Sequence, residues 1–272
     1  MRKWVTNMVF QGHFRGKYLY FRLIHFSIII LELSAYQLSE PRNVKALDIF
    51  MPDAQKSLSQ EEKELNFYKA MAQCKLGQLY TYNSELRNEE LSFFWHTEAA
   101  SNGNIESQGC LGVMNLEGIG CRKNEKSGLY CLKHATAAKD FYAAGRLAEY
   151  YYKNKLYSHC ISISKPYAVK FLLDTKCNIL DQVRTGAKQI HCSESFAVKG
   201  AVLCAFYFAR CVEKRFYDVK SLSENDENKD DEDVLLEGFS NDDIPIKIYR
   251  ACAEIEPSLM VEMQQLKLEG IV

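Results

Sequence analysis

The feature that most constrains this chain is an internal repeat of about 36 residues. Leu76-Gly77 recurs as Leu111-Gly112 and again as Leu147-Ala148, at separations of 35 and 36 residues. A second motif, in which aromatic residues precede Ala99-Ala100, recurs around Ala135, also 36 residues on. Two independent motifs at one period indicate a true repeat, and a period of roughly 20 to 50 residues is typical of solenoid proteins.

Each repeat predicts a pair of helices, and small residues mark the place where the two helices pack. Glycine inside a helix costs about 1 kcal/mol relative to alanine, so Gly77, Gly112 and Ala148 at one repeat position require a packing reason. Close approach of another helix provides that reason. Gly103 suits a left-handed helix cap, and residues 117–120 suit a Gly-rich turn. Because one hairpin cannot bury its apolar face alone, we expect residues 61–272 to form an all-α solenoid of stacked helix hairpins.

These motifs together resemble a known family. The pattern LG-x-x-Y, a Gly-rich turn and a second helix ending in AA-x-x-G is similar to the Sel1-like repeat, a relative of the tetratricopeptide repeat. The resemblance implies stacked hairpins and a non-catalytic scaffold or adaptor that binds other proteins in the cytoplasm. Three longer segments resemble family members that bind the cytoplasmic tail of a megalin-like endocytic receptor, which implies such a tail as the partner: 94–109, 149–158 and 249–259.

Charge is distributed unevenly along the chain. Residues 218–243 hold eleven acidic and two basic residues, which leaves an excess of eight positive charges elsewhere. This composition predicts a solvated, disordered acidic loop between two helices of a last hairpin, at 196–212 and 246–255. The closure entropy of a loop grows by about 0.6 kcal/mol per doubling of length, so a solenoid tolerates such an insertion. No basic residues cluster on one predicted face, so we expect no nucleic-acid partner.

Two further positions interrupt or end the repeats. The stretch from Pro166 to Phe196 lacks the repeat pattern and predicts an expanded connection with some helical periodicity. Pro257 follows the last hairpin, and proline is accepted in the first turn of a helix. We therefore expect a final helix to begin there.

The first sixty residues differ from the repeats and form an atypical N-terminal segment. Basic residues precede an apolar run at 23–38, which Glu32 interrupts. This run is compatible with a membrane-spanning helix, a secretory signal, or a buried or poorly ordered terminal helix. A charge at the centre of a span costs roughly 2.5–3.5 kcal/mol, so we expect no direct membrane insertion. A short helix is predicted at 44–50, between two prolines.

The residues that could support chemistry are not arranged for it. None of the ten cysteines forms a C-x-x-C pair, which favours inert thiols in a reducing, cytoplasmic compartment. His96 and His134 differ by two positions in the repeat register, so they do not suggest a shared metal site. We therefore expect no enzyme, metal or cofactor. A secreted or lumenal quality-control component of the Sel1-like type is the alternative, and it would need a signal peptide and disulfides.

Binding is expected on the first helix of each repeat. The aromatic runs 150–152 and 206–208 have helical spacing and are predicted to lie mostly in the core. Polar first-helix positions outside the packing motif then remain for contact with a partner: Lys75, Gln78, Asn115, Arg146 and Glu149.

Overall fold

The computed structural model describes residues 60–173, 176–218, 231–236 and 238–268, and every regular element in these ranges is an α-helix. The apolar run at 23–38 and the predicted helix at 44–50 lie outside the described residues, so their alternatives stay open. The helices are α3 (Gln60–Tyr82), α4 (Glu89–Ser101), α5 (Ile105–Glu117), α6 (Glu125–Ala137), α7 (Phe141–Lys153), α8 (Tyr157–Leu173), α9 (Lys176–Gln189), α10 (Glu194–Glu213), α11 (Asp231–Leu235), α12 (Asp243–Ile255) and α13 (Pro257–Leu268).

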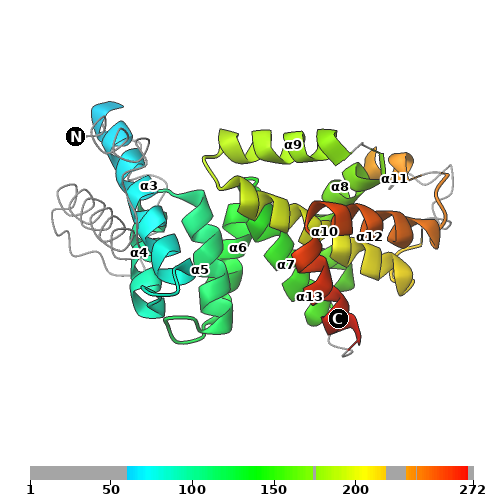
Figure 1. Ribbon diagram of the computed structural model, residues 1–272, viewed down its shortest axis with the longest axis horizontal. Helices are drawn as coiled ribbons and strands as arrows, with labels where there is room; N and C mark the ends of the chain where they lie inside the picture. Colours follow the sequence, from blue (N-terminus) through cyan, green and yellow to red (C-terminus); the bar gives the residue numbers. More distant parts are fainter. Residues whose placement is uncertain (1–59, 174–175, 219–230, 237, 269–272) are drawn as a thin grey trace, which may run out of the picture. The chain divides into compact units, whose positions relative to one another are not determined.

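The chain divides into two compact units between Asn104 and Ile105. In the described part of unit 1, α3 and α4 form an antiparallel hairpin. Unit 2 contains the hairpins α5/α6, α7/α8 and α10/α12, in which α7 packs against α5, α6 and α10 (Figure 1). The predicted all-α fold of stacked helix hairpins is thereby confirmed in these ranges. The predicted division at residue 60 falls at the edge of the described residues and stays a prediction.

The small residues of the repeat lie where the second helix of each hairpin approaches most closely. A Cβ atom at Gly77 would lie 2.7 Å from the imidazole ring of His96, and one at Gly112 would lie 2.6 Å from Cγ of Leu132. His96 and Leu132 are themselves 36 residues apart. The close helix approach predicted for these glycines is therefore confirmed. In both hairpins, the residue that approaches the glycine occupies the same repeat position on the second helix.

Helix caps follow the same period. Asn88 begins α4 and Asn124 begins α6, again 36 residues apart. The side-chain oxygen of Asn88 accepts from the backbone N–H of Leu91 at 3.0 Å, and that of Asn124 accepts from Ser127 at 3.1 Å. An asparagine in this place satisfies one of the N–H groups that the first turn of a helix leaves without a partner.

The turns between helices also repeat. Gly103 ends α4 in the left-handed region at φ 87°, and Lys139 takes the same conformation after α6 at φ 67°. Gly118 and Gly120 have φ values of 78° and 65° in the turn between α5 and α6. The predicted glycine cap and Gly-rich turn are confirmed, and Lys139 shows that the repeat keeps the backbone conformation without the glycine.

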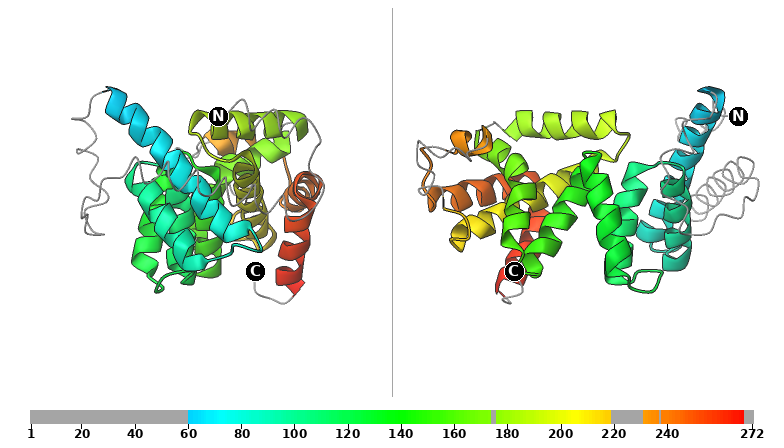
Figure 2. Two further views of the ribbon diagram at one scale, coloured as in Figure 1. Left: turned by 60° about the vertical axis from the view of Figure 1, so that its left-hand side comes forward. Right: turned by 180° about the vertical axis from the view of Figure 1, so that it is seen from behind.

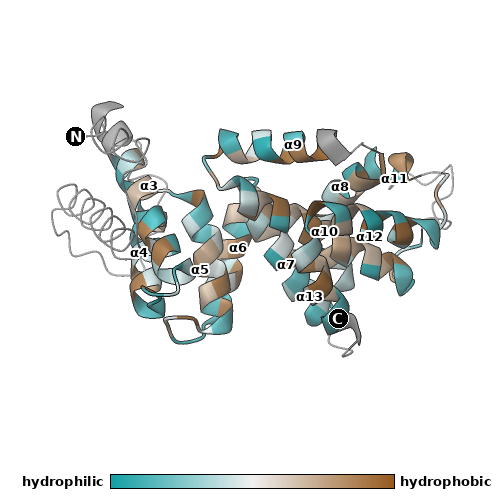
Figure 3. Ribbon diagram, viewed as in Figure 1, coloured by the Kyte–Doolittle hydropathy of each residue, from teal (hydrophilic) through white to brown (hydrophobic). Residues whose placement is uncertain are grey.

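The core of unit 2 is centred on α10. A Cβ atom at Gly145 of α7 would lie 2.5 Å from the carbonyl oxygen of Gly200 of α10, so the two backbones are in contact. Phe206, Tyr207 and Phe208 are all buried, as predicted. In the described part of the chain, α10 is long and apolar enough to cross a membrane, and 78% of that apolar window is buried inside the protein. In α12, hydrophilic and hydrophobic residues are mixed (Figure 3), and Ile244, Ile248 and Cys252, spaced four residues apart, are buried on one face.

Unit 2 also has helices that do not belong to the repeat. The connection predicted between Pro166 and Phe196 contains the end of α8, which continues through Pro166, and then α9. In each view α9 lies along one edge of unit 2 (Figures 1 and 2). Pro257 begins α13, as its position after α12 predicted.

The acidic segment at 218–243 differs from the prediction where the structure describes it. Residues 231–235 form α11, and Asp233 is buried. Its carboxylate lies 2.8 Å from Nζ of Lys165 on α8, and the hydroxyl of Tyr217 donates to the same carboxylate oxygen. This part is therefore packed against α8 and is not a solvated loop, because Lys165 provides a buried charge partner that local composition does not reveal.

Candidate protein-binding surface

Four charged side chains form a continuous chain of ion pairs on α5 and α7, which we call the α7 charge chain: Glu117, Arg146, Glu149 and Lys153. Arg146 contacts Glu117 at the end of α5 and lies 2.8 Å from Glu149 on its own helix. Lys153 contacts the other oxygen of Glu149 at 2.7 Å. Helical spacings of three and four residues bring the α7 members onto one face.

The α7 charge chain is fixed more firmly than an exposed ion pair. The side chain of Arg146 is 23% exposed and that of Glu149 is 9% exposed. Burial lowers the pKa of Arg146, but Glu149, Tyr142 and Glu117 raise it by more, so the net shift is upward. An exposed pair contributes about 0.2–1 kcal/mol, whereas removing one partner of a buried pair leaves an uncompensated charge and costs about 3–5 kcal/mol. Separating Arg146 from Glu149 is therefore costly, and the two side chains keep a fixed position relative to each other.

Aromatic side chains of α7 and α10 lie next to the α7 charge chain. Tyr207 of α10 is fully buried, and its ring lies 5.3 Å from that of Tyr152 of α7. Burial raises the pKa of Tyr207, Glu149 raises it further, and Arg146 opposes that rise. The phenol is therefore neutral, and its hydroxyl lies 4.0 Å from Sδ of Met263 on α13. We call Tyr152 and Tyr207 the α7/α10 aromatic pair; Tyr207 of this pair contacts Met263 of α13 and lies near the charges of Glu149 and Arg146.

The structure places the five predicted binding residues in three groups. Arg146 and Glu149 meet directly. Lys75 and Gln78 lie together on α3 in unit 1, where Nζ of Lys75 is 3.0 Å from the side-chain oxygen of Gln78. Asn115 uses its amide within its own helix, donating to the carbonyl of Leu111 at 2.9 Å. A role in partner binding stays a prediction for all five.

Glu117 and Lys153 of the α7 charge chain were not predicted as binding residues, although their shared position in the repeat indicates a common role. Glu117 and Lys153 are 36 residues apart and occupy the same position at the end of successive first helices. Their charges are opposite, and each pairs with a residue of α7. Comparing repeat positions by charge as well as by size would have identified both.

The two histidines of the second helices have separate packing roles. Burial lowers the pKa of His96 to about 4, so the ring that packs on Gly77 is neutral. His134 lies 2.8 Å from the side-chain oxygen of Gln108 in unit 2. Among the described residues, no group of three or more His, Cys, Asp or Glu side chains is placed to hold a metal ion.

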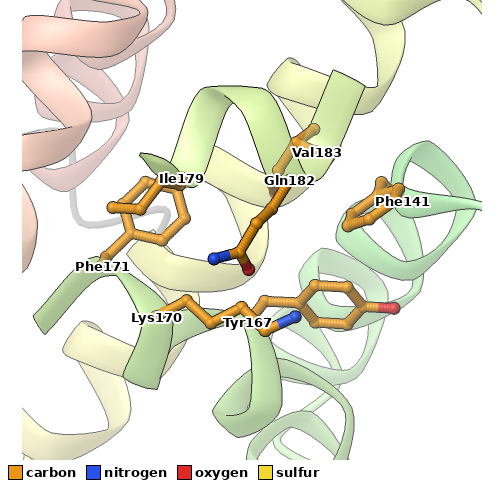
Figure 4. A pocket seen from close by; sticks show the side chains of 8 residues that line it. Phe141, Tyr167, Lys170, Phe171, Ile179, Gln182 and Val183 are labelled. Carbon is orange, nitrogen blue, oxygen red and sulfur yellow. The ribbon is translucent and has the colours of Figure 1, made fainter. Parts of the chain in front are cut away.

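A small pocket lies where α9 packs against α8, and Phe141 of α7 and Ala201 of α10 also line it. Figure 4 shows Tyr167, Lys170 and Phe171 on one side, with Ile179 and Gln182 opposite. Its volume is about 20 Å³. A cavity of this size has room for a water molecule, since one water needs about 10–15 Å³. The pocket is therefore a packing gap beside α9 and not a site for an organic ligand.

Known proteins include a solved structure that is similar to this chain. No protein-family model matches the sequence. A Sel1 repeat protein from Oxalobacter formigenes is similar to this chain at 19% identity and a TM-score of 0.32, over 76% of this chain and 77% of that one. The fold itself is defined by the helix hairpins and their repeated contacts.

Proposed function

We propose that this chain is a non-catalytic scaffold that binds another protein on the first helices of unit 2. The α7 charge chain is the observation that supports this proposal. It joins α5 to α7 and presents a partly exposed arginine beside a nearly buried carboxylate. Charges held on rigid helices give an interface its specificity and its register, because a partner must match them in place.

The shape of the site is consistent with a protein partner. Stacked helix pairs create extended surfaces that are suited to segments of other proteins. Arg146 is partly exposed between Glu117 and Glu149, and its guanidinium carries several donors, so it can offer a further N–H group to a carboxylate of the partner. Tyr150 is half-buried on the same helix and offers an aromatic contact beside Glu125, to which its hydroxyl donates.

We propose the cytoplasmic tail of a megalin-like endocytic receptor as the partner. The segments 94–109, 149–158 and 249–259 resemble the megalin-binding protein, and the second of these overlaps the end of α7. A cytoplasmic location belongs to this proposal. A secreted or lumenal Sel1-like component is the competing possibility, and a count of reduced thiols by mass spectrometry separates them. Ten reduced cysteines support the cytoplasmic proposal, and several native disulfides would contradict it.

The proposal is tested by measuring binding of the full chain to an immobilised receptor-tail peptide. We expect the double substitution R146A/E149A to weaken binding at least tenfold, because it removes both the partly exposed arginine and the carboxylate that orients it. The matched control is R87A/E89A, which removes an exposed Arg–Glu pair of 2.7 Å in unit 1. This control should bind as the wild type does.

Two results would contradict separate parts of the proposal. If the wild-type chain retains no receptor tail, the receptor is the wrong partner. If R146A/E149A binds the tail as tightly as wild type, the binding surface lies elsewhere on the molecule. Circular dichroism of each variant confirms that the helices are intact.

A further inference from the structure

The last helix, α13, packs onto the body of unit 2 through two methionines. Met260 and Met263 are 2% and 3% exposed and belong to the same core cluster as Tyr152 and Tyr207. They are three residues apart and so lie on one face of the helix. Methionine is flexible and fills irregular apolar gaps, and it is common where one surface accepts several partners.

The opposite side of α13 faces solvent. Val261 is 68% exposed, and Ser258, Gln264 and Gln265 are exposed as well. Among the α13 side chains that the structure describes, the buried ones are the two methionines, and Leu259 is half-buried. The described side chains of α13 thus contact the unit through one narrow apolar stripe, whereas α10, a core helix of the same unit, is buried on nearly all sides.

The described part of this stripe lies beside the proposed binding surface. Sδ of Met263 is 4.0 Å from the hydroxyl of Tyr207. The charges of Glu149 and Arg146 lie close enough to this hydroxyl to shift its pKa in opposite directions. The chain turns at Glu256, directly between α12 and α13, so α13 is held covalently next to the α7/α10 aromatic pair. A short tether of this kind gives a local concentration of about millimolar, which favours the internal helix over a free competitor.

We propose that α13 is an internal occupant of the apolar surface at the α7/α10 aromatic pair, and that the partner places an amphipathic helix there, with two apolar side chains three residues apart in the positions of Met260 and Met263. This inference rests on the proposed function and specifies the partner segment. It makes α13 an autoinhibitory element: a partner helix competes with it for the apolar surface while pairing with the adjacent α7 charge chain. Helix recognition of this kind depends on anchors at i and i+3.

The test measures binding of a fluorescent peptide of residues 256–268 to the full-length chain by anisotropy. In the wild type the internal α13 competes with the peptide. In M260S/M263S the internal helix loses its anchors, and we expect the peptide to bind at least tenfold more tightly than to wild type. A peptide in which both methionines are serine should bind neither chain. The matched control V261S alters an exposed residue of α13 and should give the wild-type affinity.

One result would support the inference, and three would overturn it. Tighter peptide binding to M260S/M263S than to wild type supports the inference. Equal affinities for the two chains would overturn it, as would loss of the cooperative thermal transition in M260S/M263S, since α13 would then be part of the indispensable core. Receptor-tail binding that depends on Arg146 and Glu149 while the α13 peptide fails would remove this inference and leave the proposed function standing.

Discussion

The hairpins α3/α4 and α5/α6 form the same helix–helix contact with different side chains. In α3/α4 a glycine faces a histidine, Gly77 against His96, and in α5/α6 a glycine faces a leucine, Gly112 against Leu132. The backbone is alike in both, with an asparagine cap and a left-handed residue at matching positions. The repeat therefore keeps space and backbone geometry constant, while the chemistry that fills the space varies.

A third hairpin extends this comparison. Ala148 stands at the glycine position of α7, and Ala168 of α8 lies 36 residues after Leu132. Both alanines are fully buried. The small–large pair of the first two hairpins has become two residues of equal, modest size. The methyl group gained at position 148 replaces only part of the leucine side chain missing at position 168, so neighbouring side chains must complete the dense packing of this interior.

The largest expected effect comes from copying the third hairpin into the second. L132A should lower the free energy of unfolding by about 2–5 kcal/mol through cavity formation, and G112A by about 1–3 kcal/mol through overpacking. The double variant G112A/L132A reproduces the alanine pair, so its cost should be less than the sum by about 1 kcal/mol or more. Urea denaturation measures all three. Strictly additive costs would show that the two positions do not exchange volume.

A second prediction compares the caps, because α7 begins with a buried aspartate where α4 and α6 begin with asparagine. Burial raises the pKa of Asp140 to about 7, against the opposing hydrogen bonds from the backbone of Tyr142 and Ala143. In the unfolded chain the pKa is near 3.8. The folded state therefore binds more protons between these pH values, and the contribution of Asp140 to stability is complete below about pH 4 and lost as the pH rises through 7.

The loss amounts to about 4 kcal/mol at 1.36 kcal/mol per pKa unit, as an order of magnitude. D140N keeps an acceptor for the α7 N-terminus and should remove this decline, which urea denaturation between about pH 4 and 8 measures. The control N124D puts a carboxylate at an exposed cap, where the helix dipole favours it. An unchanged pH slope in D140N would mean that Asp140 is ionised in the folded protein.

A third prediction concerns the residue that faces the glycine, which is His96 in α3/α4 and Leu132 in α5/α6. Burial lowers the pKa of His96 from 6.5 to about 4, so the unfolded chain binds more protons between these values. The stability that neutral His96 contributes is present above about pH 6.5 and is lost as the pH falls through 4, by about 3 kcal/mol. H96L, which installs the side chain of the α5/α6 hairpin, should abolish this acid sensitivity. H159Q, at an exposed histidine, should retain it; acid sensitivity that persists in H96L would contradict the assignment.

The comparison of hairpins also explains what the sequence could predict. The glycine positions, the left-handed cap at Gly103 and the turn after α5 depend on local backbone requirements, and each was predicted from the residues present. The aromatic run of α10 was placed in the core by its spacing. These features are visible in sequence because a repeated fold imposes the same local constraint several times.

Contacts between distant residues could not be predicted in the same way. The burial of Asp233 depends on Lys165, which is 68 residues away, and composition alone indicated a solvated loop. The position of Met263 against Tyr207 depends on the direction in which α13 leaves α12. The equivalence of His96 and Leu132 in the repeat could not be recognised from the sequence, because a polar residue occupies this position in one hairpin and an apolar residue in the other. In each case the missing information was the identity of the packing partner.

The smallest expected effect concerns how readily each hairpin opens. The described core cluster of unit 1 consists of Leu76 and Trp95, whereas Cys131 lies in a unit with a much larger cluster. Cys74 of α3 and Cys131 of α6 are both buried and report on the two hairpins separately. Because local opening is easiest where few apolar contacts are lost, Cys74 should react with a thiol reagent several-fold faster than Cys131 in the native protein.

Burial also raises the pKa of Cys131 to about 11, so the labelling rate of each cysteine must be compared with its rate in the unfolded chain. Peptide mapping by mass spectrometry measures both, with half-buried Cys121 as the rapidly labelled reference; equal protection of Cys74 and Cys131 would show that the α3/α4 hairpin is as stable as α5/α6.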